Sequence, residues 1–345
     1  MMMPGFVFPY YKARGVSFAR NGKWQAANSF KNDPGPYGLT GVRLSSRSKG
    51  AELTLTGDGG VFEWAEVAFL AGPGGGEAKV IFGDGKQSIS THAPNSQIKR
   101  VRIRRKGRKL TVTAMSKKTV SLLSWSVGHN RPGIRYVNFG IPGANAGTPS
   151  RWDDALLRDG LAALKPDLII LGYGTNEGFH DGLEGEAYQN QVVALLERLK
   201  GGAPNAGFLI LGPPDSLRFP RFARGKNKKV RSNAPCRALS TAEVQDYARL
   251  KKANSKQLAR WHAPPKLAVV RASLKSVAEK NGARFWDWSS VMGSPCGIHA
   301  WAKATPPLAA SDRVHLRSGG AKRSAEKLFD ELMSGYEAHV QLVSG

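Results

Sequence analysis

The sequence predicts an α/β protein in two parts, a β-rich part followed by a parallel sheet covered by helices. Roughly residues 11–130 consist of short segments rich in β-branched or aromatic residues, separated by Gly- or Pro-containing turns. From about residue 131 onward, continuous apolar runs alternate with segments of helical spacing. This alternation is typical of a parallel sheet that is buried on both faces.

The regular spacing of short strands in the first part predicts a β-sandwich or jelly roll. We expect strands at 51–57, 61–72, 77–85 and 86–93. Residues 97–115 are expected to form a hairpin with one apolar and one cationic face. Val101 and Ile103 alternate there with arginines, and Leu110 and Val112 continue the pattern after a turn.

In the second part we expect strands at 134–140, 166–171, 207–214 and 283–288, and helices at 152–164, 186–201, 267–282 and 318–336. The segment 215–262 is long and basic, and we interpret it as a loop insertion at the edge of a site. Its part 217–233 contains seven Lys or Arg residues and no acidic residue. A solvated loop without a binding role is the alternative interpretation.

The composition is that of an ordinary globular protein, but its charge is strongly unbalanced. The net charge is +25 and the isoelectric point is near 10.3. Such a balance favours anionic partners such as nucleic acid, anionic lipid or an acidic polymer, although a basic surface also serves solubility alone. No apolar run is long enough to span a membrane, and no His/Cys cluster suggests zinc.

The first residues, MMMPGFVFPYY, lack the basic region, the long apolar stretch and the cleavage site of a signal peptide. Taken literally, the chain therefore stays in the cytoplasm. Its two cysteines, Cys236 and Cys296, fit either one disulfide or two reduced thiols.

Three short motifs fall at the ends of predicted strands, where parallel-sheet proteins place their working residues. They are FGIPGAN with Gly143, GTNE with Asn176, and SDRVH with Asp312 and His315. A carboxylate three residues before a histidine can orient the imidazole as in a Ser-His-Asp triad. An Asn side chain and a Gly N–H can donate to an oxyanion.

Each motif also has a simpler interpretation. Asp312 is then the N-cap of the last helix with His315 solvated, Gly143 is a turn glycine, and Asn176 caps the helix that follows it. The catalytic interpretation is favoured because the three motifs fall at one edge of one predicted sheet.

Together these motifs resemble those of the SGNH (GDSL-type) esterases: a Gly in the second block, G-x-N-[DE] in the third and D-x-x-H in the fifth. The phrases YGTNEGF, NGKWQAANS and LGPPDSL are similar to one subgroup, the periplasmic O-acetylesterases that act on peptidoglycan or other bacterial polysaccharides. The resemblance covers nearly the whole chain.

The resemblance implies a flavodoxin-like three-layer core with a parallel sheet and an inserted β-sandwich or jelly-roll module. Residues 1–130 are expected to be the carbohydrate-binding-like module, inserted after the first strand of the hydrolase. Residues 131–345 are expected to be the α/β domain with the basic loop insertion 215–262.

The resemblance also implies roles for the site residues. Gly143 and Asn176 are the oxyanion donors, His315 is the general base and Asp312 is its partner. It implies no metal or organic cofactor, and an acetylated glycan, either peptidoglycan or another anionic polysaccharide, as the substrate.

The chain departs from the family at the nucleophile, because it contains no Gly-Asp-Ser block. GDG occurs at 57–59 and 83–85 without a serine, and Ser216 in Pro214-Asp215-Ser216 follows a later strand, so we do not expect it to be the nucleophile. The first strand of the sheet is also missing. We therefore expect that the chain starts at an internal Met and that the signal peptide, first strand and nucleophilic serine lie upstream.

On this expectation the full-length product is periplasmic or secreted, where Cys236 and Cys296 can join in a disulfide, with two reduced buried thiols as the alternative. Two other functions stay open. One is a polysaccharide-binding relative without catalysis. The other is nucleic-acid binding, which only the charge supports, because no helix-turn-helix, zinc finger or RNP-type motif occurs.

Overall fold

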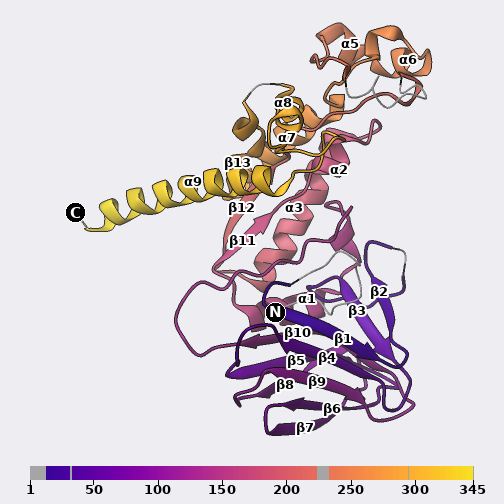
Figure 1. Ribbon diagram of the computed structural model, residues 1–345, viewed down its shortest axis with the longest axis vertical. Coiled ribbons are helices and arrows are strands. Elements are labelled where there is room, and N and C mark those ends of the chain that lie inside the picture. Colours follow the sequence, from indigo (N-terminus) through magenta and orange to yellow (C-terminus); the bar gives the residue numbers. More distant parts are fainter. Residues whose placement is uncertain (1–12, 32, 224–232, 294, 345) are drawn as a thin grey trace. The chain divides into compact units, whose positions relative to one another are not determined.

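The computed structural model describes residues 13–31, 33–223, 233–293 and 295–344. The chain divides into two compact units (Figure 1), which we describe separately. Unit 1 comprises residues 1–167 and 195–206, and unit 2 comprises residues 168–194 and 207–345. The predicted fold class, a parallel α/β sheet together with a β-rich module, is confirmed.

Unit 1 is built on two antiparallel sheets, with strand orders β1-β4-β9-β6-β7 and β2-β3-β10-β5-β8 among the described residues. Large apolar side chains from both sheets, among them Leu53, Phe69 and Trp125, form one buried cluster between them. Burying each such side chain contributes about 1.5–3 kcal/mol, and this apolar layer is what holds the sandwich together. The strands are β1 (Val16–Asn21), β2 (Gln25–Asn28), β3 (Val42–Ser46), β4 (Glu52–Gly57), β5 (Trp64–Ala71), β6 (Glu77–Phe82), β7 (Gly85–Ser90), β8 (Gln97–Ile103), β9 (Lys109–Ala114) and β10 (Val120–Gly128).

The prediction of a hairpin at residues 97–115 is wrong. The two strands exist, but β8 pairs with β5, while β9 pairs with β4 and β6 in the other sheet. The connection therefore crosses from one sheet to the other. Val101 of β8 and Leu110 of β9 are both buried in the layer between the sheets, so the chain satisfies the same alternating pattern without pairing the strands.

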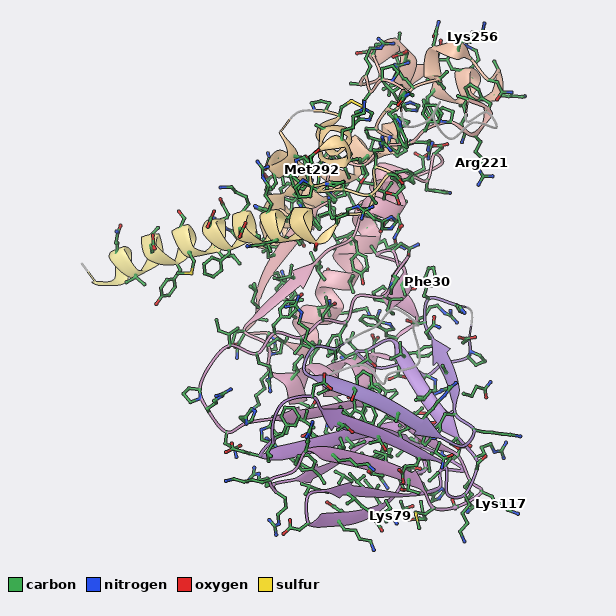
Figure 2. The ribbon with its side chains drawn as sticks, viewed as in Figure 1. Phe30, Lys79, Lys117, Arg221, Lys256 and Met292 are labelled. Atoms are coloured by element: carbon green, nitrogen blue, oxygen red, sulfur yellow. A yellow bond between two sulfur atoms is a disulfide. The ribbon has the colours of Figure 1, made fainter. Side chains whose placement is uncertain are left out.

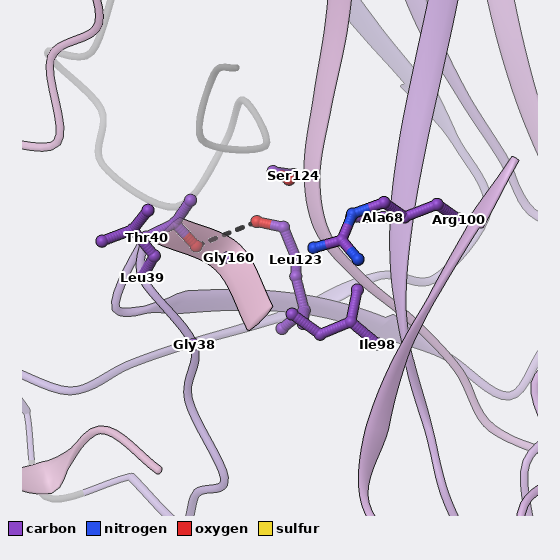
Figure 3. Close-up of a pocket in the computed structure, with 9 residues that line it drawn as sticks. All are labelled: Gly38, Leu39, Thr40, Ala68, Ile98, Arg100, Leu123, Ser124 and Gly160. Carbon is purple, nitrogen blue, oxygen red and sulfur yellow. Dashed lines mark hydrogen bonds between the residues drawn. The ribbon is translucent and has the colours of Figure 1, made fainter. Parts of the chain in front are cut away.

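Helix α1 (Asp154–Leu164) packs against β8 within unit 1, although the sequence placed it in the second domain. Arg100 of β8 forms an ion pair with Asp159 of α1. Figure 3 shows a small gap nearby, where the Thr40 hydroxyl donates to the Leu123 carbonyl at 3.0 Å. The gap has a volume of about 10 Å³, so it has room for one water molecule and for no larger ligand.

Unit 2 contains the parallel sheet, with β12 (Gly207–Gly212) between β11 (Leu168–Leu171) and β13 (Arg284–Asp287). Helix α7 (Pro265–Lys280) packs on β12 and β13 with its apolar side, which includes Val270 and Leu274. The other described helices of unit 2 are α2 (Thr175–Gly178), α5 (Thr241–Gln245), α6 (Tyr247–Lys252), α8 (Gly297–Lys303) and α9 (Ser318–Ser344), with the 3₁₀ turns η2 (Arg221–Ala223), η3 (Lys256–Leu258) and η4 (Trp288–Met292). Helix α3 (Gly185–Gly202) has residues in both units, and the 3₁₀ turn η1 (Thr148–Arg151) belongs to unit 1.

The strand predicted at 134–140 is not formed, and Ile134 and Tyr136 in it are 102% and 81% exposed. A strand needs a neighbour to pair with, and residues 134–140 pair with no strand among the described residues. The edge of β11 that faces away from β12 has no partner among the described residues. Leu168 and Ile170 are 44% and 39% exposed, which is unusual for the interior of a parallel sheet.

The segment 215–262 is not the simple loop that the sequence predicted. It contains α5 and α6, and Ser240 and Glu243 form a capping box at the start of α5. Figure 2 shows Arg221 and Lys256 projecting from this segment. Much of the predicted cationic stretch, residues 224–232, and the start of the chain, residues 1–12, lie outside the described residues.

A disulfide joins Cys236 in this segment to Cys296 at the start of α8. The bond lies beside a buried apolar cluster that includes Leu217, Trp261 and Ile298. The segment is thus attached to the rest of unit 2 by a covalent bond and by an apolar core. In the part of the chain that the structure describes, no helix is long and apolar enough to cross a membrane.

Candidate active site

The GTNE motif forms the turn after β11 and the short helix α2. Gly174 is the N-cap of α2 with φ +118°, and its N–H donates to the Glu177 carboxylate at 3.0 Å. A Cβ on Gly174 would lie 2.8 Å from Cγ1 of Val270 in α7. The position therefore requires glycine for both its backbone conformation and its space, and the turn holds Asn176 exposed at the second residue of α2.

We expect Gly174→Ala to lower the free energy of unfolding by about 2 kcal/mol or more, because it adds strain at a positive φ and a clash with α7. Gly172→Ala is the matched control two residues earlier, since a Cβ there meets only Leu211, at 4.0 Å. Urea unfolding of both variants measures the difference. Equal stabilities for the two variants would contradict the strained turn.

Asp312 and His315 are in contact, as the motif SDRVH predicts. Asp312 Oδ2 lies 2.7 Å from His315 Nδ1, and Oδ1 accepts the backbone N–H groups of Val314 and His315 at 2.9 and 3.1 Å. Between them, Arg313 has a left-handed backbone with φ +57° and packs over the ring of Trp261. Because α9 begins only at Ser318, Asp312 does not act as the N-cap of that helix.

This geometry fixes the tautomer that the imidazole takes. Burial acts to raise the pKa of Asp312, but the hydrogen bonds from His315 and from the backbone outweigh it and place the pKa below its ordinary value. An ionised Asp312 accepts a proton-bearing Nδ1, so the neutral imidazole presents an unprotonated Nε2. The His315 side chain is 79% exposed, and no described residue hydrogen-bonds Nε2. The pair can therefore act as a general base toward a group that approaches Nε2.

Gly143 lies in unit 1, whereas Asn176, Asp312 and His315 lie in unit 2. Its φ of +82° is left-handed, so glycine is the residue that this turn accepts without strain. The ring of Phe30 lies beside it in the same unit. Of these residues, Asp312 and His315 are in direct contact within unit 2.

The sequence contains no Gly-Asp-Ser block, and the serine of Pro214-Asp215-Ser216 is buried. Ser216 is 0% exposed, and its hydroxyl contacts the Pro214 carbonyl at 3.5 Å. Asp215 is also buried and accepts the N–H of Ile298 at 3.2 Å. Asp215 thus joins the turn after β12 to α8, and the Ser216 hydroxyl bonds within that turn. Within the described residues, no group of three or more His, Cys, Asp or Glu side chains is placed to hold a metal ion.

The comparison with known families decides the class of the protein. The profile of the GDSL-like Lipase/Acylhydrolase family matches residues 120–323, more than half of the chain. The chain belongs to this family. The match includes Gly143, Asn176, Asp312 and His315, and the family membership confirms the resemblance read from the sequence.

One solved structure shows the same fold over nearly the whole chain. A structure titled "Peptidoglycan O-acetylesterase in action, 5 min" shares 24% identity, covers 96% of this chain and 80% of its own, and has a TM-score of 0.71. A carbohydrate acetylesterase from Sinorhizobium meliloti shares 16% identity over 53% of this chain and 70% of its own, with a TM-score of 0.32. No curated protein sequence matches the chain.

Proposed function

We propose that this GDSL-family protein is a carbohydrate O-acetylesterase that acts on a bacterial cell-wall glycan. The observation that carries the proposal is the 2.7 Å contact between Asp312 and His315 in a region that matches an acylhydrolase family. The similarity to a peptidoglycan O-acetylesterase supports the choice of an acetyl ester and of a glycan. An enzyme with that substrate works in the periplasm or outside the cell, where the disulfide is stable.

We further propose that the nucleophilic serine comes from a segment outside residues 1–345. Two observations support this. The sequence has no Gly-Asp-Ser block, and the edge of β11 that no described strand pairs with, where Leu168 and Ile170 are exposed, offers backbone groups and apolar side chains to one more strand. A strand placed there would deliver its carboxyl end beside the turn after β11, where Asn176 stands.

In the proposed mechanism the serine Oγ attacks the acetyl carbonyl and His315 Nε2 takes its proton. Asp312 holds the imidazole and stabilises its charged form, while the Asn176 amide and the Gly143 N–H donate to the oxyanion. The sugar hydroxyl leaves with the proton from His315. Water, deprotonated by His315, then releases acetate from the acetyl-enzyme. No step requires a metal or an organic cofactor.

We propose the domain roles as follows. Residues 1–130 serve as the carbohydrate-binding-like module, inserted after the first strand of the hydrolase, and residues 131–345 serve as the hydrolase domain. The antiparallel sandwich, which ends at Gly128, supports the first assignment, and the family match supports the second.

Acetate release from O-acetylated peptidoglycan or p-nitrophenyl acetate tests the proposal. We expect none from residues 1–345 and turnover from a protein that carries the segment encoded upstream in the same reading frame. The competing function is a polysaccharide-binding relative without catalysis, which the absent Gly-Asp-Ser block favours. An upstream frame that encodes no strand followed by Gly-Asp-Ser, and an inactive extended protein, would establish that alternative.

A further inference from the structure

A cleft in unit 2 has no role in the proposed chemistry. It has a volume of about 620 Å³, within the range of roughly 300–1,000 Å³ typical of ligand pockets. Its walls come from α5, α6 and the first residues of α7, and one carboxylate, that of Asp181, lies in its lining. Its charged lining residues are Asp181, Lys251, Lys252 and Lys266.

The carboxylate of Asp181 forms ion pairs with two cations. Arg218 and Lys251 each approach one of its oxygens at 2.5 Å. Burial acts to raise the pKa of Asp181, but the hydrogen bonds from these two cations outweigh it and lower the pKa. Asp181 therefore stays ionised and paired, and it does not offset the remaining charge of the cleft.

Lys252 and Lys266 supply that remaining charge. Neither forms an ion pair with any residue that the structure describes. Apolar side chains stand beside them, including Val244, which is 44% exposed, and Val269. A concave surface with two unpaired ammonium groups and apolar walls is complementary to an anion on an amphipathic ligand such as a sugar.

A buried polar network holds the wall of the cleft. Arg218 donates to the Tyr247 hydroxyl at 3.1 Å, and that hydroxyl lies 3.1 Å from His262 Nε2. His262 Nδ1 lies 3.0 Å from the Arg260 carbonyl, so Nδ1 carries the proton and Nε2 accepts from Tyr247. Burial lowers the pKa of His262 to about 4, and the ring is neutral at pH 7. The network thus positions α6 without adding charge.

The same network connects the cleft to the candidate active site. Arg218 also donates to the carbonyl of Phe179, the C-cap residue of α2, which carries Asn176. Helix α2 packs on α7, and the first residues of α7 line the cleft. The turn that carries Asn176 and the cleft therefore share Arg218 and α7 as neighbours.

We infer that this cleft binds a carboxylate of an acidic glycan through Lys252 and Lys266. The inference rests on the proposed function for the identity of the ligand as a glycan. The two ammonium groups hydrogen-bond the carboxylate, and the apolar side chains contact the sugar ring. The cleft thereby selects acidic over neutral glycans.

Isothermal titration of the 345-residue chain with trigalacturonate, and with neutral maltotriose for comparison, tests the inference without any turnover. We expect Lys252→Gln combined with Lys266→Gln to weaken trigalacturonate binding about tenfold or more. The matched control, Lys275→Gln with Lys280→Gln, removes the same charge from the other end of α7 and is expected to change binding less than about twofold.

Equal weakening by the two pairs, equal affinity for maltotriose, or no binding of trigalacturonate would each overturn the inference. The titration needs no turnover. Binding of trigalacturonate by a protein whose extended form releases no acetate would contradict the esterase proposal and not the cleft, while acetate release without trigalacturonate binding would contradict the cleft alone.

Discussion

His315→Ala, made in the enzyme that carries its nucleophile, is expected to lower kcat for acetate release by about a thousandfold or more, with little change in KM. The reason is geometric. His315 Nδ1 is held by Asp312 at 2.7 Å, and Nε2 is left to take the serine proton. Without the imidazole, the serine attacks only as a neutral hydroxyl, while the oxyanion donors and the glycan contacts remain.

The matched control is His92→Ala in the sandwich of unit 1, where the side chain is exposed and the hydrogen bonds that the structure describes for this residue use only its backbone. Steady-state kinetics on p-nitrophenyl acetate measures both variants, and the control should turn over like the unmodified enzyme. If His315→Ala retained more than about a tenth of the activity, His315 would not be the general base.

Removing the disulfide between Cys236 and Cys296 is expected to lower the free energy of unfolding by about 3–4 kcal/mol. The bond joins two cysteines that are 60 residues apart in sequence, so it closes a long loop in the unfolded chain. It also fixes the segment around α5 and α6 to α8 beside the cluster that contains Trp261.

Urea unfolding of the oxidised and the dithiothreitol-reduced protein measures this difference. The variant with both cysteines changed to alanine is the control, because a reductant should leave its midpoint unchanged. An oxidised and a reduced protein with the same midpoint would show that the bond adds nothing to the stability of the native chain.

For β8 and β9 the sequence predicts the strands but not which strands they pair with. Their alternating apolar residues, such as Val101 and Leu110, identify each strand correctly. Alternation says which side chains are buried, but it does not say which strand is the neighbour. In a sandwich both sheets bury residues in the same layer, so a hairpin and a crossover have the same pattern.

The first of the two short helices in the segment 215–262, α5, has a local signal in the sequence that the loop prediction did not use. Ser240 and Glu243 have the spacing of a capping box, and the structure forms it at the start of α5. By contrast, residues 134–140 have the composition of a strand and form none. Composition favours a strand only when a neighbour is present to pair with it.

The sequence predicts one part of the functional surface and misses another. Asp312 and His315 are three residues apart, so one turn of chain brings them together and the spacing alone predicts the contact. The cleft residues Asp181, Lys252 and Lys266 come from separate segments, which only the folded structure brings to one surface. No motif marks them, which explains why the sequence did not identify the cleft.

The site of covalent attack tests the central claim most directly. A serine-directed phosphonylating reagent, followed by peptide mass analysis, locates the nucleophile in the active, extended protein. We predict no adduct on residues 1–345 alone, and a single adduct on the serine of the added segment that is lost in His315→Ala. An adduct on any serine within residues 1–345 of the active protein, Ser216 included, would contradict the account.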